Sequence, residues 1–164
     1  MAFDLSMPIL VVDDYATMIR IVRNLLKRLG FENVDDACDG SAALAKTQVK
    51  KYELVISDWN MEPMTGYDLL REVRASPELS KTPFIMITAE SKTENVIAAK
   101  KAGVSNYIVK PFNAATLKTK MKRCSAPPNR SHMPRAHGRT NTAFDLHIWL
   151  TINGDNCATH RRTP

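Results

Sequence analysis

The sequence predicts an α/β fold, a doubly wound parallel sheet of five strands with five helices, in residues 1–124. Two observations support this prediction. Short apolar runs alternate with amphipathic segments along this part of the chain, which is the pattern of repeated βαβ units. Most of the apolar runs are continuous rather than alternating, as expected for strands that are covered by helices on both faces.

The predicted strands are short and end in polar residues. They are expected at residues 9–12, 34–37, 54–56, 84–87 and 107–109. The first helix is predicted over residues 15–29, because Met18, Val22, Leu25 and Leu29 recur at helical spacing and Gly30 follows as a stop. The other four helices are expected at residues 41–50, 66–75, 93–102 and 114–123.

Residues 125–164 are predicted to be a mostly disordered tail or a non-native extension rather than a second domain. The βα pattern stops after Cys124, and Pro127 and Pro128 should end the last helix. All four histidines of the chain lie in this segment, but their spacing matches no ligand pattern of a metal site.

Composition excludes several classes of protein. The net charge of +6 is spread along the chain without a dense Lys/Arg block, so neither nucleic acid nor a membrane surface is an expected partner. No apolar stretch is long enough to cross a bilayer and no signal peptide is recognised, which predicts a cytoplasmic protein. Three widely spaced cysteines suggest neither a disulfide framework nor a zinc site.

The residues that carry chemistry follow the predicted strands. Asp13 and Asp14 follow the first strand, and Asp58, Thr88 and Lys110 follow the third, fourth and fifth. The carboxyl ends of parallel strands meet at one edge of the sheet, where ligands bind in such folds. Alone, each of these residues would be a helix cap, a loop carboxylate or a solvated charge. Their shared position at one edge favours a common site.

Three carboxylates at one edge would repel one another unless a cation neutralised them. Mg²⁺ prefers oxygen ligands and binds through one or two carboxylates together with a phosphate. Lys110 would add a positive charge and Thr88 a hydroxyl donor for phosphoryl oxygens. Phosphoryl transfer depends mainly on such positioning and charge neutralisation. The pattern therefore favours Mg²⁺-assisted phosphoryl chemistry.

Four segments resemble the signature segments of response-regulator receiver domains, and they occur in the same order and at the usual separations. The resemblance is strongest to receiver domains of the single-domain chemotaxis type. The four segments read V-V-D-D at residues 11–14, S-D-W-N-M at 57–61, M-I-T-A-E at 86–90 and Y-I-V-K-P-F at 107–112. The resemblance covers residues 7 to 123 and implies a flavodoxin-like strand order 2-1-3-4-5. It also implies a cis peptide bond between Lys110 and Pro111.

The resemblance assigns a role to each site residue. Asp58 would be the phosphoacceptor, and Thr88 and Lys110 would hold the phosphoryl oxygens. Asp14 and Asp58 would bind Mg²⁺ directly, Asp13 would act on it through a water, and the backbone carbonyl of Asn60 would complete the protein ligands. Asn60 and Glu90 would tune dephosphorylation, and Tyr107 would be the switch residue.

The resemblance implies that the protein is a phosphoacceptor module. Such a module is not an enzyme in the ordinary sense, because it catalyses only its own phosphotransfer and dephosphorylation. The partners would be a sensor histidine kinase or a phosphotransfer protein and, in chemotaxis, a flagellar motor switch protein. A phosphorelay intermediate or phosphate sink without a motor target is the alternative. A haloacid-dehalogenase-like hydrolase is disfavoured because Asp13-Asp14-Tyr15 is not the D-x-D motif of that class.

Overall fold

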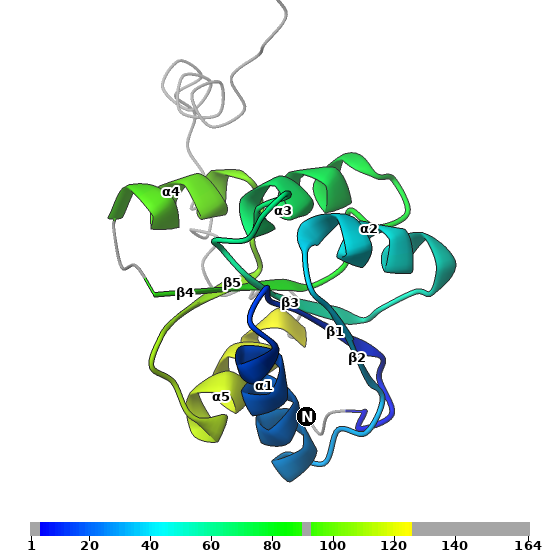
Figure 1. Ribbon diagram of the computed structural model, residues 1–164, viewed down its shortest axis with the longest axis vertical. Helices are drawn as coiled ribbons and strands as arrows, with labels where there is room; N and C mark the ends of the chain where they lie inside the picture. Colours follow the sequence, from blue (N-terminus) through cyan, green and yellow to red (C-terminus); the bar gives the residue numbers. More distant parts are fainter. Residues whose placement is uncertain (1–3, 90–92, 126–164) are drawn as a thin grey trace, which may run out of the picture. The chain divides into compact units, whose positions relative to one another are not determined.

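The computed structural model describes residues 4–89 and 93–125. The described chain forms one five-stranded parallel sheet in the order β2-β1-β3-β4-β5, as the resemblance implied. Helices α2, α3 and α4 cover one face of the sheet, and α1 and α5 cover the other (Figure 1). The predicted fold class is therefore confirmed.

The strands lie where the sequence predicted them, with two informative differences. They are β1 (Ile9–Val12), β2 (Val34–Ala37), β3 (Leu54–Asp58), β4 (Phe84–Thr88) and β5 (Asn106–Val109). β3 and β4 continue beyond their apolar runs to Asp58 and Thr88, because Asp58 is in register with Ile87 and Thr88 with Val109. Two site residues therefore belong to the sheet itself, which holds their backbone in place.

The helices follow the predicted ranges to within two residues at each end. They are α1 (Ala16–Arg28), α2 (Gly40–Val49), α3 (Gly66–Ala75), α4 (Thr93–Lys101) and α5 (Ala114–Ser125). Asp39 caps α2 by accepting hydrogen bonds from the backbone N–H groups of Ser41 and Ala42, and Thr65 caps α3. Gly30 and Gly103 follow α1 and α4 with φ angles of 95° and 86°, a backbone conformation that favours glycine.

The sheet separates two apolar cores. Alternate residues of each central strand point to opposite faces. In β1, Ile9 and Val11 pack in the core beneath α1 and α5, whereas Leu10 and Val12 pack in the core beneath α2 and α3. All four side chains are buried, which explains why this strand is continuously apolar in sequence.

The predicted tail, residues 125–164, falls almost entirely outside the described residues, so its disorder stays a prediction. α5 continues to Ser125, two residues past the predicted end. None of the helices in the described ranges combines the length and the apolar composition that crossing a membrane requires.

Candidate functional site

The backbone of the candidate site is an extension of the parallel sheet. The N–H of Asp13 donates to Ala37 O at 3.2 Å, just beyond β1. The N–H of Lys110 donates to Thr88 O at 2.7 Å, just beyond β5. The sheet hydrogen bonding thus continues past the strand ends and fixes the starting points of these side chains. It brings together residues that are far apart in the sequence, as the strand-end pattern predicted.

Lys110 lies between the two buried carboxylates of the site. Its Nζ is 2.7 Å from Asp58 Oδ1 and 3.5 Å from Asp13 Oδ2. The peptide bond between Lys110 and Pro111 is cis, as the resemblance implied. The two carboxylate side chains are only 8% and 6% exposed, so water screens these ion pairs weakly. Asp13, Asp58 and Lys110 therefore form a compact charged triad.

The two oxygens of Asp58 have different partners. Oδ2 accepts a hydrogen bond of 2.8 Å from the backbone N–H of Asn60. Oδ1 is buried and lies 2.7 Å from Lys110 Nζ, which is its one partner within the described residues. A buried carboxylate oxygen with unused acceptor capacity is unfavourable in isolation. This oxygen is therefore available to a further electrophilic or cationic partner.

Asp14 and Asn60 lie at the rim of the site rather than in its interior. Both are exposed. They line a surface hollow of about 410 Å³ together with Tyr15, Met61, Glu62 and Thr65. The hollow thus begins one residue after Asp13 and two residues after Asp58 in the chain.

The expectation that three carboxylates converge is met only in part. Within residues 4–89 and 93–125, no three acidic, histidine or cysteine side chains are close enough to share an ion. Lys110, rather than a third carboxylate, accompanies Asp13 and Asp58. The donor set still fits Mg²⁺, because Asp13, Asp14, Asp58 and the Asn60 carbonyl all offer oxygen and Asp58 Oδ1 has an unused acceptor site.

Thr88 and Tyr107 lie on neighbouring strands behind the triad. Thr88 ends β4 and is buried. Tyr107 in β5 is in register with Met86, is half-buried, and packs against the core beneath α2 and α3. The predicted switch pair therefore occupies adjacent strands. Glu90 lies outside the described residues, so its predicted role in dephosphorylation stays a prediction.

Burial and ion pairing shift the pKa values of Asp13 and Lys110. Burial raises the pKa of Asp13 and outweighs the opposing hydrogen bond from Tyr15 N–H and the charge of Lys110. Burial alone would lower the pKa of Lys110, but its contacts with Asp58 and Asp13 outweigh that effect and raise it. Lys110 is therefore a cation at neutral pH.

The role of Gly66 was not predicted from the sequence, in which this residue marks only the start of a helix. A Cβ atom at this position would lie 1.8 Å from Asp58 O and 2.8 Å from Ser57 Oγ. The N–H of Gly66 donates to Trp59 O at 3.0 Å. α3 thus begins in direct contact with the backbone of Asp58. A glycine at the first position of a helix eight residues after the acidic strand end was the available signal.

Residues 9–122 match the family model described as the response regulator receiver domain. The chain belongs to this family. A curated relative of this receiver domain, the chemotaxis protein CheY-3 of Vibrio cholerae, is 53% identical over 116 residues, which are 71% of this chain and 89% of the relative. The solved structure of chemotaxis protein CheY4 from Vibrio cholerae aligns with a TM-score of 0.68 and 36% identity, over 73% of this chain and 98% of CheY4.

Another similar solved structure contains magnesium. The response regulator TrrA of Thermotoga maritima, in complex with Mg²⁺-BeF, aligns with the receiver domain at a TM-score of 0.64 and 32% identity, over 72% of this chain and 98% of TrrA. Binding of Mg²⁺ is typical of the family.

The pKa shift of Asp13 leads to a prediction about the stability of the receiver domain. With EDTA present at pH 7, Asp13→Asn should raise the free energy of unfolding by roughly 1 kcal/mol. The folded state binds the Asp13 proton more readily than the unfolded chain, so the ionised group is unfavourable above its ordinary pKa of 3.8. Asparagine keeps the acceptor for Tyr15 N–H and Lys110 keeps its closer partner, Asp58.

Urea unfolding of Asp13→Asn and the wild type at several pH values tests this prediction. The stability gain should be present at pH 7, shrink as the pH falls through the raised pKa of folded Asp13, and be lost below 3.8, where Asp13 is protonated in both states. A variant that is less stable than the wild type at pH 7 would contradict the prediction.

Proposed function

We propose that this chain is a single-domain response regulator of a two-component phosphorelay, in which Asp58 accepts a phosphoryl group from a histidine kinase with Mg²⁺. The observation that carries the proposal is the buried Asp58 carboxylate at the end of β3, whose Oδ1 lies 2.7 Å from Lys110 Nζ. A carboxylate oxygen would attack the phosphorus of a phosphohistidine. The P–N bond would break, and the released imidazole would take a proton from solvent.

Mg²⁺ would be held by Asp13, Asp14, Asp58 and the backbone carbonyl of Asn60, and when bound it would neutralise charge on the transferring phosphoryl group. Lys110 already contacts Asp58 and needs little movement to bind a phosphoryl oxygen there. The Thr88 hydroxyl, at the end of the neighbouring strand, would donate to another phosphoryl oxygen. These groups orient the phosphoryl group and offset its charge, which is most of what such a transfer requires.

The signal would pass from Thr88 to Tyr107. A phosphoryl group adds nearly two negative charges and strong acceptor oxygens, which would draw Thr88 towards it. Tyr107 is half-buried on the adjacent strand and could turn inward into the space that Thr88 leaves. The surface formed by α4, β5 and α5 would then shift between two packings.

Asn60 and Glu90 would tune how long the phosphoryl group survives, since Asn60 lines the hollow from which water would approach. The chain would therefore catalyse its own phosphorylation and dephosphorylation without acting on a separate substrate, which is why we do not class it as an enzyme. We place it in the cytoplasm, without a membrane or nucleic-acid partner.

The partners would be a sensor histidine kinase or phosphotransfer protein and, because the relatives named above are chemotaxis proteins, a flagellar motor switch protein. A phosphorelay intermediate or phosphate sink remains the second candidate. The measured lifetime of the phosphorylated form, and its binding to a motor switch protein, would distinguish the two.

Intact mass after incubation with acetyl phosphate tests the proposal. The wild type should gain the mass of one phosphoryl group with Mg²⁺ and not with EDTA, and Asp58→Asn should gain none. Asp4→Asn makes the same chemical change at an exposed site and should behave as the wild type. Uptake by Asp58→Asn equal to that of the wild type, or no uptake by folded wild type with Mg²⁺, would contradict the proposal.

A further inference from the structure

The sequence was expected to spread its positive charge along the chain, but in the receiver domain the charges are segregated between elements. α1 carries Arg20, Arg23, Lys27 and Arg28, α5 carries Lys118, Lys120, Lys122 and Arg123, and neither helix contains an acidic residue. The rest of residues 1–124 carries ten Lys and Arg against fifteen Asp and Glu. Two helices therefore account for the entire positive excess of this part of the chain.

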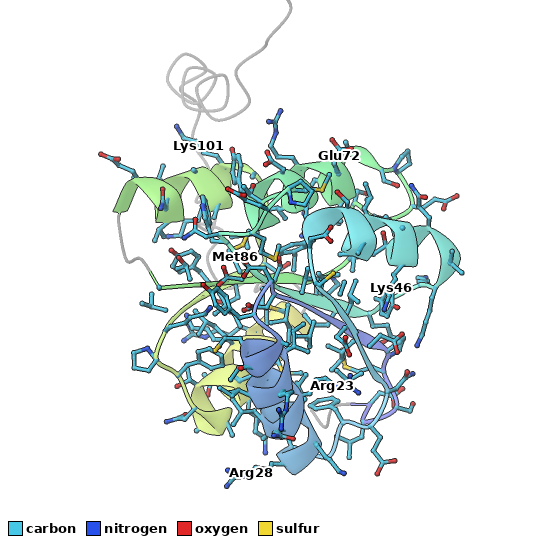
Figure 2. The ribbon with its side chains drawn as sticks, viewed as in Figure 1. Arg23, Arg28, Lys46, Glu72, Met86 and Lys101 are labelled. Carbon is cyan, nitrogen blue, oxygen red and sulfur yellow. The ribbon has the colours of Figure 1, made fainter. Side chains whose placement is uncertain are left out.

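The two basic helices are neighbours in space. α1 and α5 contact one another and cover the same face of the sheet (Figure 1). Seven of the eight basic side chains are exposed and Lys120 is half-buried. Figure 2 shows Arg23 and Arg28 on α1, across the sheet from Lys101 on α4. We call these eight residues of α1 and α5 the α1–α5 basic face.

The charges of this face are mostly uncompensated. Within the described part of the chain, Arg23 alone of the eight residues is in an ion pair, with Asp36. Basic residues in the last turn of a helix offset its dipole, which accounts for Lys27, Arg28, Lys122 and Arg123. The remaining members lie in earlier turns, where the dipole gives no reason for them.

A hollow of about 410 Å³ opens at the α1 side of this face. It is lined by Arg23, Asn24 and Lys27 on α1 and by Phe31, Glu32 and Val34 in the segment that leads into β2. The hollow thus combines two cations and an amide with one acid and two apolar side chains. Its volume is sufficient for a side chain of a bound polypeptide.

We propose that the α1–α5 basic face is a docking surface for an acidic polypeptide segment of a partner protein, with one apolar side chain of that segment in the hollow. The charge of the face complements carboxylates. Residues 125–164 do not fit as the occupant, because they carry five basic and two acidic residues. Nucleic acid fits less well, because the remainder of residues 1–124 is net negative and would repel an extended polyanion.

Amide chemical shifts of the full Asp58→Asn chain, recorded by NMR with EDTA, test this proposal separately from phosphoryl chemistry. The probe is a short synthetic peptide of Glu and Asp around one central Leu. A peptide with Gln and Asn in their place is the control. The acidic peptide should shift amides of α1, α5 and residues 31–34, and raised salt should weaken its binding.

A matched pair of double variants gives the decisive comparison. Lys27→Gln with Lys118→Gln should raise the Kd of the acidic peptide roughly fivefold. Lys100→Gln with Lys101→Gln removes the same charge from α4, on the other face of the sheet, and should change the Kd less than about twofold. All four side chains are exposed, and thermal unfolding of both variants verifies that they fold.

Three results would overturn the proposal. Equal weakening by both double variants would mean that binding depends on net charge alone, and shifts centred on α4 would place the peptide elsewhere. Tighter binding of a duplex DNA or of phosphatidylserine vesicles to the same residues would assign the face to a different kind of partner.

Discussion

Gly66→Ala should lower the free energy of unfolding by about 3 kcal/mol, which is near the upper end of the cost of overpacking a core. The same substitution should slow phosphoryl uptake at least tenfold. The new Cβ would lie 1.8 Å from Asp58 O, so α3 and the end of β3 must separate. The displaced atom belongs to the backbone of the proposed phosphoacceptor. Any relaxation therefore moves Asp58 relative to Lys110, and misplacement of this kind is costly for transfer chemistry.

Gly40→Ala is the matched control for this prediction. Gly40 also begins a helix, but its nearest neighbour is the flexible side chain of Met64, at 2.6 Å from the added Cβ, with Met64 O at 2.9 Å. The cost should be smaller, about 1 kcal/mol, and phosphoryl uptake should stay close to that of the wild type. Urea unfolding and uptake from acetyl phosphate measure both effects. The prediction is wrong if the two variants behave alike.

Lys110→Met should lower the free energy of unfolding at pH 7 by about 2 kcal/mol, because it leaves two buried carboxylates without their cation. It should also slow phosphoryl uptake at least tenfold, since no cation would then lie beside Asp58 to offset the charge of the incoming phosphoryl group. The folded state raises the pKa of Lys110 above its ordinary 10.5, so the stabilisation is fully present below that pH.

The pH dependence of Lys110→Met separates this mechanism from a general loss of packing. Without the cation, the pKa of Asp13, which burial already raises, should rise further, so the stability deficit should shrink from pH 7 towards pH 4. Lys50→Met removes the ion pair with Asp35, whose partners are 41% and 39% exposed, and should cost less than about 1 kcal/mol. A deficit for Lys110→Met that does not depend on pH would contradict the mechanism. The measurements are made with EDTA.

Much of the fold could be predicted from sequence because burial on both faces leaves a strong pattern. β1 and β4 are wholly buried, so their apolar runs mark them directly. β2 is an edge strand and contains Asp35 and Asp36, which are half-buried and in ion pairs with Lys50 and Arg23. Its position in the βα repeat identified it rather than its composition.

The candidate site could be predicted only as a set of residues. Because the carboxyl ends of parallel strands meet at one edge of the sheet, Asp13, Asp58 and Lys110 were correctly predicted to lie together there. The register of the backbone alone determines where each side chain starts. The sequence could not show which of these side chains contact one another, since side-chain contacts depend on rotamers and on which charges neutralise one another. It also could not show that Asp14 is exposed.

Gly66 was missed for a different physical reason. Its importance comes from the close approach of the α3 backbone to Asp58 O, a contact that depends on how a helix packs against a strand end. Sequence patterns indicate which residues are buried and which elements they form. A glycine at the start of a helix is compatible with such a pattern whether or not it contacts a neighbouring backbone. Only the three-dimensional arrangement distinguishes Gly66 from Gly40.

Borohydride trapping tests whether Asp58 itself carries the phosphoryl group. Hydride reduces an aspartyl phosphate to homoserine with release of phosphate, so tandem mass spectrometry of the digested protein locates the modified residue. After incubation with acetyl phosphate and Mg²⁺, homoserine is expected at position 58 and at no other aspartate. Homoserine at Asp13 or Asp14 instead, or none in protein that has gained a phosphoryl group, would contradict the proposed function.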